Sequence, residues 1–271
     1  MQIRQIITVA AKEFRDRIRN RWVLVVAMIF ALFALVIAYM GGAQQGSVGF
    51  QSIGVVIASL VSLVIYLIPL IALILGFDAI VGERERGSLG LLLAMPITRF
   101  ELLMGKFAGL SAALALSTLV GFGLVALVLL PYLTPAEFMQ FFGFIVSSIV
   151  LGLIFISLAL LVSVVSQERT QASGLAIGAW FFFVLIFDLI LMGGLVASGG
   201  NVTGEWLPAL LLLNPTDVFR ILNLFALEDV RAMFGLATVL PPALSQPGLL
   251  MAVMLLWIAA PLAIATWRFK E

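Results

Sequence analysis

Six long apolar segments, almost free of charge, limit what this chain can fold into. They occupy residues 22–40, 53–81, 107–130, 138–165, 172–197 and 249–267. Each is close to or longer than the roughly 20 helical residues that cross a hydrocarbon layer of about 30 Å. Because 63% of the residues are hydrophobic and only 11% are charged, a chain of 271 residues has more apolar surface than a water-soluble core needs. The sequence therefore predicts an integral membrane protein.

These segments are expected to be helices rather than the strands of a barrel. A barrel strand alternates apolar and polar side chains at every second residue, whereas the stretch 24–38 is apolar throughout. We therefore predict an all-α membrane protein with six transmembrane helices. Residues 1–271 are expected to form a single transmembrane domain.

The distribution of Lys and Arg predicts the orientation of the helices. With the N-terminus in the cytoplasm, only Arg220 and Arg231 of the fifteen basic residues fall on the far side. The other thirteen are Arg4, Lys12, Arg15, Arg17, Arg19, Arg21, Arg84, Arg86, Arg99, Lys106, Arg169, Arg268 and Lys270. Since basic residues concentrate in cytoplasmic segments, we expect both termini to lie in the cytoplasm.

Several kinds of chemistry are excluded by the residues that the chain lacks. It contains no Cys and no His, so thiolate metal sites, disulfides and imidazole catalysis are ruled out, and no metal site is predicted. The Gly105-Lys106 pair is followed by Phe107 and lacks the pattern of a phosphate-binding loop. The largest predicted cytoplasmic insertion, about 25 residues, is shorter than the roughly 50 residues of a small domain. We therefore expect no enzymatic activity and no cofactor bound by this chain itself.

Residues 1–21 are predicted to form an amphipathic elbow helix that lies in the headgroup layer. Apolar residues recur at helical spacing at Ile3, Ile6, Ile7, Ala10, Phe14 and Ile18. The alternative is a basic stretch that only orients the first span, which by itself explains Arg17, Arg19 and Arg21. The candidate residues of the elbow helix are Lys12, Phe14, Arg15 and Arg19.

A charged segment at residues 82–106 separates the second and third spans and is predicted to contain a short helix. Gly87 is expected to end the preceding helix, and Ser88 to cap a new one through its hydroxyl. That helix covers Leu89 to Ala94 and is stopped by Pro96, after which Thr98 and Glu101 form a capping box for the third span. Its bulky apolar side chains suit the groove of a partner, and the alternative is a solvated, charge-balanced turn.

This segment resembles the cytoplasmic coupling segment of ABC-2 type permeases. The matching residues are Glu83, Gly87, Ser88, Leu92, Pro96, Arg99 and Lys106, with Ser88 in place of the commoner threonine. The resemblance implies a six-span subunit that forms a homodimer and binds separate cytoplasmic ATPases, which hold the ATP and Mg²⁺. It assigns ATPase coupling to Glu83, Arg84, Glu85, Arg86, Gly87, Ser88, Leu92, Pro96 and Arg99.

Further segments narrow the resemblance to the permeases that serve maturation of the copper centres of nitrous oxide reductase. They are Lys12-Glu13-Phe14, Asp78 to Glu83, Phe187-Asp188-Leu189 and Leu212 to Asp217. The resemblance implies a periplasmic β-helical partner beside the ATPase, and a copper-carrying lipoprotein reached through the complex. It leaves two functions open, which are export of a sulfur species and mechanical transmission of ATPase motion. Membrane lipid is a further expected contact, and nucleic acid is not.

The longest predicted extramembrane segment covers residues 198–248 and is expected to face the periplasm. Within it, Asn214-Pro215-Thr216-Asp217 starts a helix whose apolar residues share one face. We predict an amphipathic helix on the membrane surface, with Asn214, Thr216, Asp217 and Arg220 as candidate contacts for the periplasmic partner. The alternative is simple packing against the membrane surface.

Two acidic residues lie inside predicted spans. Asp188 is about sixteen residues into the fifth span, roughly 24 Å from its cytoplasmic end, where a carboxylate costs on the order of 2.5 to 3.5 kcal/mol. It is expected either to be neutralised by a proton or a neighbouring helix, or to form a polar contact at the dimer seam or in an outer vestibule. Asp78 lies near the cytoplasmic end of the second span, where we expect a cap or a bond to Arg84 or Arg86.

Two other functions stay open at this point. One is a general ABC-2 exporter of an amphipathic or lipidic molecule. The other is an ion-coupled carrier without an ATPase, for which Asp188 would be the proton site, although no inverted repeat is visible in the sequence.

Overall fold

The computed structural model describes residues 3–19, 21–40, 53–197, 210–224 and 246–269, and every regular element in these ranges is helical. The N-terminal part contains α1 (Ile3–Arg19), α2 (Trp22–Met40), α3 (Ile53–Gly76), α4 (Val81–Glu85), α5 (Ser88–Ala94) and α6 (Arg99–Leu129). The rest contains η2 (Leu130–Tyr132), α7 (Pro135–Val165), α8 (Arg169–Phe181), η3 (Phe182–Ile186), α9 (Phe187–Ala197), α11 (Pro215–Leu224) and α13 (Pro247–Arg268). The predicted all-α class is confirmed for these residues.

Five helical stretches in the described ranges are long and apolar enough to cross a membrane. They are Val56–Glu85, Arg99–Leu129, Pro135–Val165, Arg169–Gly194 and Pro247–Arg268. A sixth is obtained if Ile3–Arg19 and Leu24–Tyr39, which meet at 64°, are counted as one span. We treat the apolar α2 as the membrane segment of this pair and the charged α1 as a separate helix outside the spans. The chain is therefore a multi-pass membrane protein.

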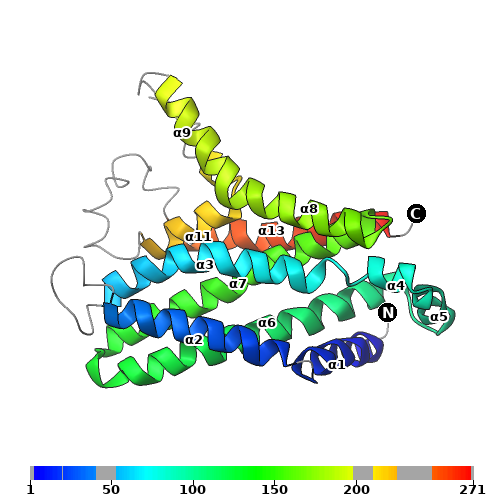
Figure 1. The fold of residues 1–271 in the computed structure, drawn as a ribbon, viewed down its shortest axis with the longest axis horizontal. Coiled ribbons are helices and arrows are strands. Elements are labelled where there is room, and N and C mark those ends of the chain that lie inside the picture. Colours follow the sequence, from blue (N-terminus) through cyan, green and yellow to red (C-terminus); the bar gives the residue numbers. More distant parts are fainter. Residues whose placement is uncertain (1–2, 20, 41–52, 198–209, 225–245, 270–271) are drawn as a thin grey trace.

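The helices form an elongated bundle with the short helices α4 and α5 at one end (Figure 1). Helices α3, α6 and α7 run along the bundle, with α2 beside α6 and α13 beside α7. Helices α4 and α5 lie at the same end as α1 and the last turn of α13, so both chain ends are on one side of the bundle. This arrangement agrees with an even number of membrane crossings.

Capping boxes set where the two longest helices begin. Thr98 accepts a hydrogen bond from the backbone N–H of Glu101, and the Glu101 carboxylate accepts one from the backbone of Thr98 at 2.9 Å. The predicted capping box is thus confirmed, and α6 begins at Arg99 rather than at residue 107. Thr134 and Glu137 form a second capping box at the start of α7, which the sequence analysis missed. Each box satisfies N–H groups that a helix start leaves without partners.

Aromatic side chains fill the middle of the bundle. Phe122 of α6 stacks on Phe30 of α2 at 5.1 Å between ring centroids and meets Phe144 of α7 edge-on at 5.4 Å. Phe144 in turn packs against Phe219 of α11 at 6.2 Å. All four side chains are buried. These rings connect four helices through the tilted and edge-on contacts that aromatic pairs favour.

Helix α1 packs closely against α6, because two glycines of α6 remove the side chains that would separate them. A Cβ at Gly105 would lie 2.6 Å from the Val9 side chain, and one at Gly109 would lie 2.6 Å from the backbone oxygen of Ala10. The prediction of an elbow that only lies among lipid headgroups is therefore incomplete. Ile3 and Ile7 of its apolar stripe remain exposed, whereas Ala10 contacts α6.

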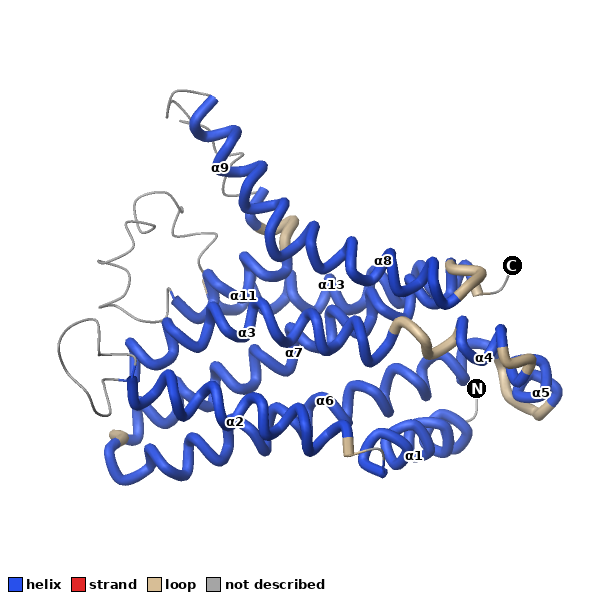
Figure 2. Tube along the Cα trace, in the orientation of Figure 1, coloured by secondary structure: helices blue, strands red, loops and turns tan. Residues whose placement is uncertain are grey.

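The fifth span is bent where a π-helical segment, η3, separates α8 from α9. Beyond it, α9 leaves the side of the bundle (Figure 2), and its apolar side chains are exposed, including Leu189 and Val196. A π-segment disrupts the regular ladder of helix hydrogen bonds, and such segments are common causes of helix bends. The predicted span 172–197 is thus made of two straight pieces that point in different directions.

The helix predicted at Asn214 to Asp217 is present as α11, but its predicted position on the membrane surface is wrong. It packs against α3, α7 and α13, and Pro215, Thr216, Asp217 and Val218 are all buried. The reason is that its polar first turn finds hydrogen-bond partners inside the protein, which allows both sides of the helix to be covered.

The contact between α1 and α6 predicts opposite effects for two matched substitutions. We expect Gly109→Ala to destabilise the protein by about 1–3 kcal/mol, because the new Cβ meets backbone rather than a movable side chain. Gly143→Ala on α7, where a Cβ meets nothing within 4 Å, should be neutral or stabilising by up to about 1 kcal/mol. The apparent melting temperature in detergent measures both. Equal shifts would contradict the close contact.

Candidate functional site

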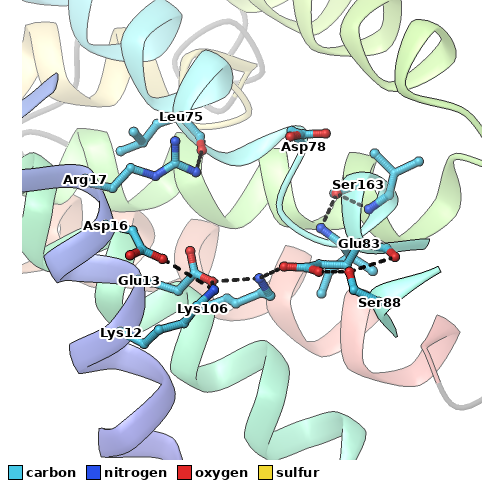
Figure 3. A network of polar contacts seen from close by, with 12 residues as sticks. Lys12, Glu13, Asp16, Arg17, Leu75, Asp78, Glu83, Ser88, Lys106 and Ser163 are labelled. Atoms are coloured by element: carbon cyan, nitrogen blue, oxygen red, sulfur yellow. Dashed lines mark hydrogen bonds and ion pairs between the residues drawn. The ribbon is translucent and has the colours of Figure 1, made fainter. Parts of the chain in front are cut away.

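A buried lysine joins three helices at the end of the bundle that carries α5. We define the Lys106 network as Lys12, Glu13, Asp16, Glu83, Ser88 and Lys106. Lys106 of α6 places its Nζ 2.8 Å from Glu13 of α1 and 3.6 Å from Glu83 of α4 (Figure 3). The Ser88 hydroxyl at the start of α5 donates to the Glu83 carboxylate. The network therefore connects α1, α4, α5 and α6.

Because the ion pair between Lys106 and Glu13 is buried, each charge depends on the other for its stabilisation. The Lys106 side chain is 3% exposed and that of Glu13 is 8% exposed, so neither charge can be hydrated fully. Burial would raise the pKa of the Glu13 carboxyl, but the charge and hydrogen bond of Lys106 hold that pKa below its ordinary value. The Glu13 carboxylate is therefore ionised, and removal of either partner would leave a buried charge without compensation.

Hydrogen bonds attach α4 to the end of α7. The Ser163 hydroxyl of α7 accepts the backbone N–H groups of Ile80 and Val81 at 2.9 and 3.0 Å, which caps the start of α4. The Arg84 guanidinium donates to the backbone oxygens of Val164 and Ser166. The last turn of α7 and the whole of α4 are thus held as one unit.

A second set of contacts attaches α4 to the start of α8. The Glu85 carboxylate accepts the backbone N–H of Arg169 at 2.6 Å, at the helix end where a negative charge is favourable. The Arg169 side chain pairs with Asp78 at 2.6 Å. The prediction that Asp78 bonds Arg84 or Arg86 is therefore wrong, because Arg84 turns to α7 and Arg169 occupies the space beside Asp78. Gly82 permits the arrangement, since a Cβ there would lie 2.2 Å from the Asp78 carboxylate.

The short helix α5, which follows α4, exposes some of its apolar side chains. Leu91 is 75% exposed and Met95 is 51% exposed, whereas Leu92 and Leu93 pack toward the core. Gly87, with a φ of 72°, makes the left-handed turn that begins the helix. The cap itself differs from the prediction, because Gly87 and not Ser88 is the N-cap residue, and the Ser88 hydroxyl is used by Glu83.

The remaining predicted coupling residues are separated by the structure. Arg99 donates to the backbone oxygen of Phe269 at 2.6 Å, next to the end of α13, and takes no part in the Lys106 network. Pro96 accepts a hydrogen bond from Gln5 of α1. Arg86 is exposed and lines a polar cavity of about 220 Å³ together with Lys12 and Lys106. Sequence spacing alone did not distinguish these three positions.

The predicted elbow residues also divide into two groups. Lys12 belongs to the network, with Nζ 3.4 Å from both Glu13 and Asp16. Phe14 is half-buried, and Arg15 and Arg19 are exposed. The central role of Glu13 was not predicted from the sequence. Its place between the apolar residues Ala10 and Phe14, as an acidic side chain in a helix with more basic than acidic residues, was the signal that could have indicated it.

A second polar cluster lies where η3 meets α11. Asn214 and Thr216 both donate to the backbone oxygen of Phe183, at 2.9 and 3.0 Å, and this carbonyl belongs to the π-helical segment. Asp217 accepts from Asn214 at 2.9 Å and pairs with Arg220 at 2.5 Å. The cluster therefore supplies partners to a carbonyl at the bend of the fifth span.

Arg220 also accounts for the acidic residue of the fifth span, because it lies 3.0 Å from Asp188. The expected neutralisation of Asp188 by a neighbouring helix is thus provided by a basic side chain. The prediction that Asn214, Thr216 and Asp217 contact a periplasmic partner disagrees with their burial, which leaves them 0%, 1% and 1% exposed. They bind η3 and each other instead.

Metal binding finds little support in these clusters. Within the described ranges, no group of three or more acidic residues is placed to hold an ion. Met251 and Met254 lie one helical turn apart on α13, and Met254 is fully buried in the core. Packing explains its position.

The burial of Lys106 predicts a large difference between two lysine substitutions. Lys106→Met leaves Glu83 without its ion pair and Glu13 with only the exposed Lys12, and it should cost about 3–5 kcal/mol of stability. Lys12→Met, which removes a side chain that is 58% exposed, should cost about 0–1 kcal/mol. Thermal unfolding in detergent tests both variants. Similar losses would show that the buried pairs of Lys106 contribute little.

Comparison with known proteins identifies the family of the chain. The family model of the ABC-2 family transporter protein matches residues 7–271. A protein of Pseudomonas aeruginosa described as a probable ABC transporter permease protein NosY is 46% identical over 270 residues, 97% of each chain. A protein of Stutzerimonas stutzeri with the same description is 43% identical over 271 residues, 98% of each chain. The chain therefore belongs to the ABC-2 family of transporter permeases.

Proposed function

We propose that this chain is the membrane subunit of an ATP-driven complex and binds a separate cytoplasmic ATPase through α5 and the adjoining part of α1. The observation that carries the proposal is the exposure of Leu91 and Met95 on and just after the short helix whose first residue, Ser88, joins the Lys106 network. Exposed bulky apolar residues beside a charged rim are typical of protein contacts. ATP and Mg²⁺ are bound by the partner, and both termini of this chain lie in the cytoplasm of a bacterial inner membrane.

The contacts around α4 give a route for motion from that surface into the membrane. Hydrogen bonds join α4 to α7 and α8, and the Lys106 network joins it to α1 and α6. A displacement of α5 therefore moves the cytoplasmic ends of several spans together rather than bending one loop. ATP binding by the partner supplies the difference in affinity between two states that such a switch needs.

The exposed face of α8 supports a homodimer. Gly174 and Gly178 lie four residues apart on α8, and a Cβ at either position meets nothing within 4 Å. Leu175 and Ile177 beside them are about half exposed. Two glycines at this spacing allow membrane helices to approach closely. A second copy of the chain packed on this face covers both.

We further propose that the complex serves the maturation of the copper centres of nitrous oxide reductase. The support is the name NosY of the two relatives, together with their similarity over nearly the whole chain. The pairing of Asp188 with Arg220 favours mechanical transmission over an ion-coupled carrier, since no free acid is left at that position. A periplasmic β-helical partner and export of a sulfur species belong to the same proposal.

Substitutions on α5 test the ATPase contact. Leu91→Ser and Met95→Ser should each weaken co-purification of the ATPase about tenfold, because exposed apolar anchors dominate such interfaces. The matched control is Met139→Ser in the first turns of α7, a helix that begins at the end of the bundle away from α5 (Figure 1), and Met139 is 65% exposed. Copper content of nitrous oxide reductase from a host that lacks its own permease should fall with the α5 variants and not with the control. Unchanged ATPase binding in both α5 variants would contradict the proposed surface.

Single cysteines test the dimer face, because the chain contains no Cys. Ile177→Cys on α8 should form a disulfide-linked dimer on mild oxidation in membranes, since facing copies bring the two positions within about 7 Å. Ile264→Cys on α13 is the control, with 48% exposure against 51% for Ile177. Cross-linking of the control with none at Ile177 would move the dimer face to α13.

A further inference from the structure

An apolar groove follows α6 along the side of the bundle. Its first part, about 390 Å³, lies between α6 and the α1–α2 junction and is lined by residues that include Arg21, Leu24 and Leu116. Its second part, about 550 Å³, lies between α6 and α7 and reaches Leu130 and Phe138. Val120 and Leu124 line both parts. The two cavities therefore adjoin each other along α6, and together they are called the groove below.

Two glycines of α6 shape this groove in different ways. A Cβ at Gly121 would lie 2.6 Å from Phe30 of α2, so this position holds α2 close to α6. A Cβ at Gly123 meets nothing within 4 Å and would project into open space beside Leu124 and Leu127. The groove is thus an open channel along a closely packed helix pair, and it does not result from a loose contact between the two helices.

The length of the groove fits a long apolar chain. From Leu116 to Leu130 the α6 axis and its continuation rise by roughly 21 Å at about 1.5 Å per residue. This length exceeds the hydrocarbon depth of one bilayer leaflet, which is about 15 Å, so the groove is long enough for a whole acyl chain. Every lining residue of the second part is apolar or glycine, so no hydrogen bond is available to a polar occupant there.

One end of the groove carries a positive charge. Arg21 lies in the turn between α1 and α2, with a φ of 55°, and its side chain is exposed. It forms no ion pair with another residue of the described ranges. Arg19, in the last turn of α1, is exposed nearby in the chain. A headgroup at this end would therefore meet basic side chains.

We propose that this groove binds a phospholipid with an anionic headgroup. Its phosphate lies at Arg21, and one acyl chain follows α6 past Gly123 toward Phe138. Basic residues at a membrane surface attract anionic lipids. An acyl chain fills the space beside Gly123, where no side chain is present. The lipid then fills the junction of α1, α2 and α6. The proposal does not depend on the function proposed above.

Native mass spectrometry of the full-length chain, taken from mixed micelles with equal phosphatidylglycerol and phosphatidylethanolamine, tests this binding. Wild-type protein should retain phosphatidylglycerol preferentially. Arg21→Gln should reduce that preference about fivefold. Gly123→Leu should remove retention, because the leucine fills the groove without meeting protein atoms. Arg4→Gln, in the first turn of α1 at its other end, and Gly143→Leu are the matched controls, and both should retain the lipid.

Other results would overturn the proposal. Equal retention of both lipids by wild-type protein, unchanged in Gly123→Leu, would mean an ordinary lipid shell without a site. Loss of a dimer peak in Gly123→Leu, with no lipid retained by wild type, would mean that a second copy of the chain covers the groove. A Gly123→Leu variant that fails to fold leaves Arg21→Gln decisive, since an unchanged lipid preference there would exclude the headgroup contact.

Discussion

The ion pairs of the buried Lys106 ammonium group are the interaction on which the end of the bundle that carries α5 depends. Its two carboxylate partners come from helices that are far apart in the sequence, Glu13 from α1 and Glu83 from α4. A charge in this position is unfavourable unless both partners stay near it. The glycines at positions 105 and 109 bring α1 close enough for that contact. Electrostatics and close packing therefore act on the same pair of helices.

Buried polar contacts also connect helices at the bend of the fifth span. There, a π-helical segment leaves the carbonyl of Phe183 directed toward α11, and the first turn of α11 supplies two donors. Arg220 then compensates the acidic residue of α9 as well as Asp217. Polar residues that are costly in a membrane are thus used in pairs, and each pair fixes the position of one helix relative to another.

Much of the fold could be predicted from features that depend on residues close together in the sequence. Apolar length predicts the spans, and Thr98 with Glu101 predicts the start of α6, because both depend on residues close together in the chain. The burial of α11 did not follow, since its amphipathic pattern fits a membrane surface as well as a protein interior. The same limit applies to Asp78, whose partner Arg169 is distant in sequence. Contacts across the bundle require the fold itself, and the coupling roles of α4 and α5 stay predictions.

The bond between Asn214 and Phe183 joins residues separated by 31 positions. The chain between them is therefore a closed loop whose two ends meet inside the protein, whatever path the loop takes between them. Closing a loop of this length has an entropic cost that grows only slowly with its length, so the number of residues in the loop has little effect on the bond at its base. A change in the angle of the π-helical segment would shift both ends of the loop at once.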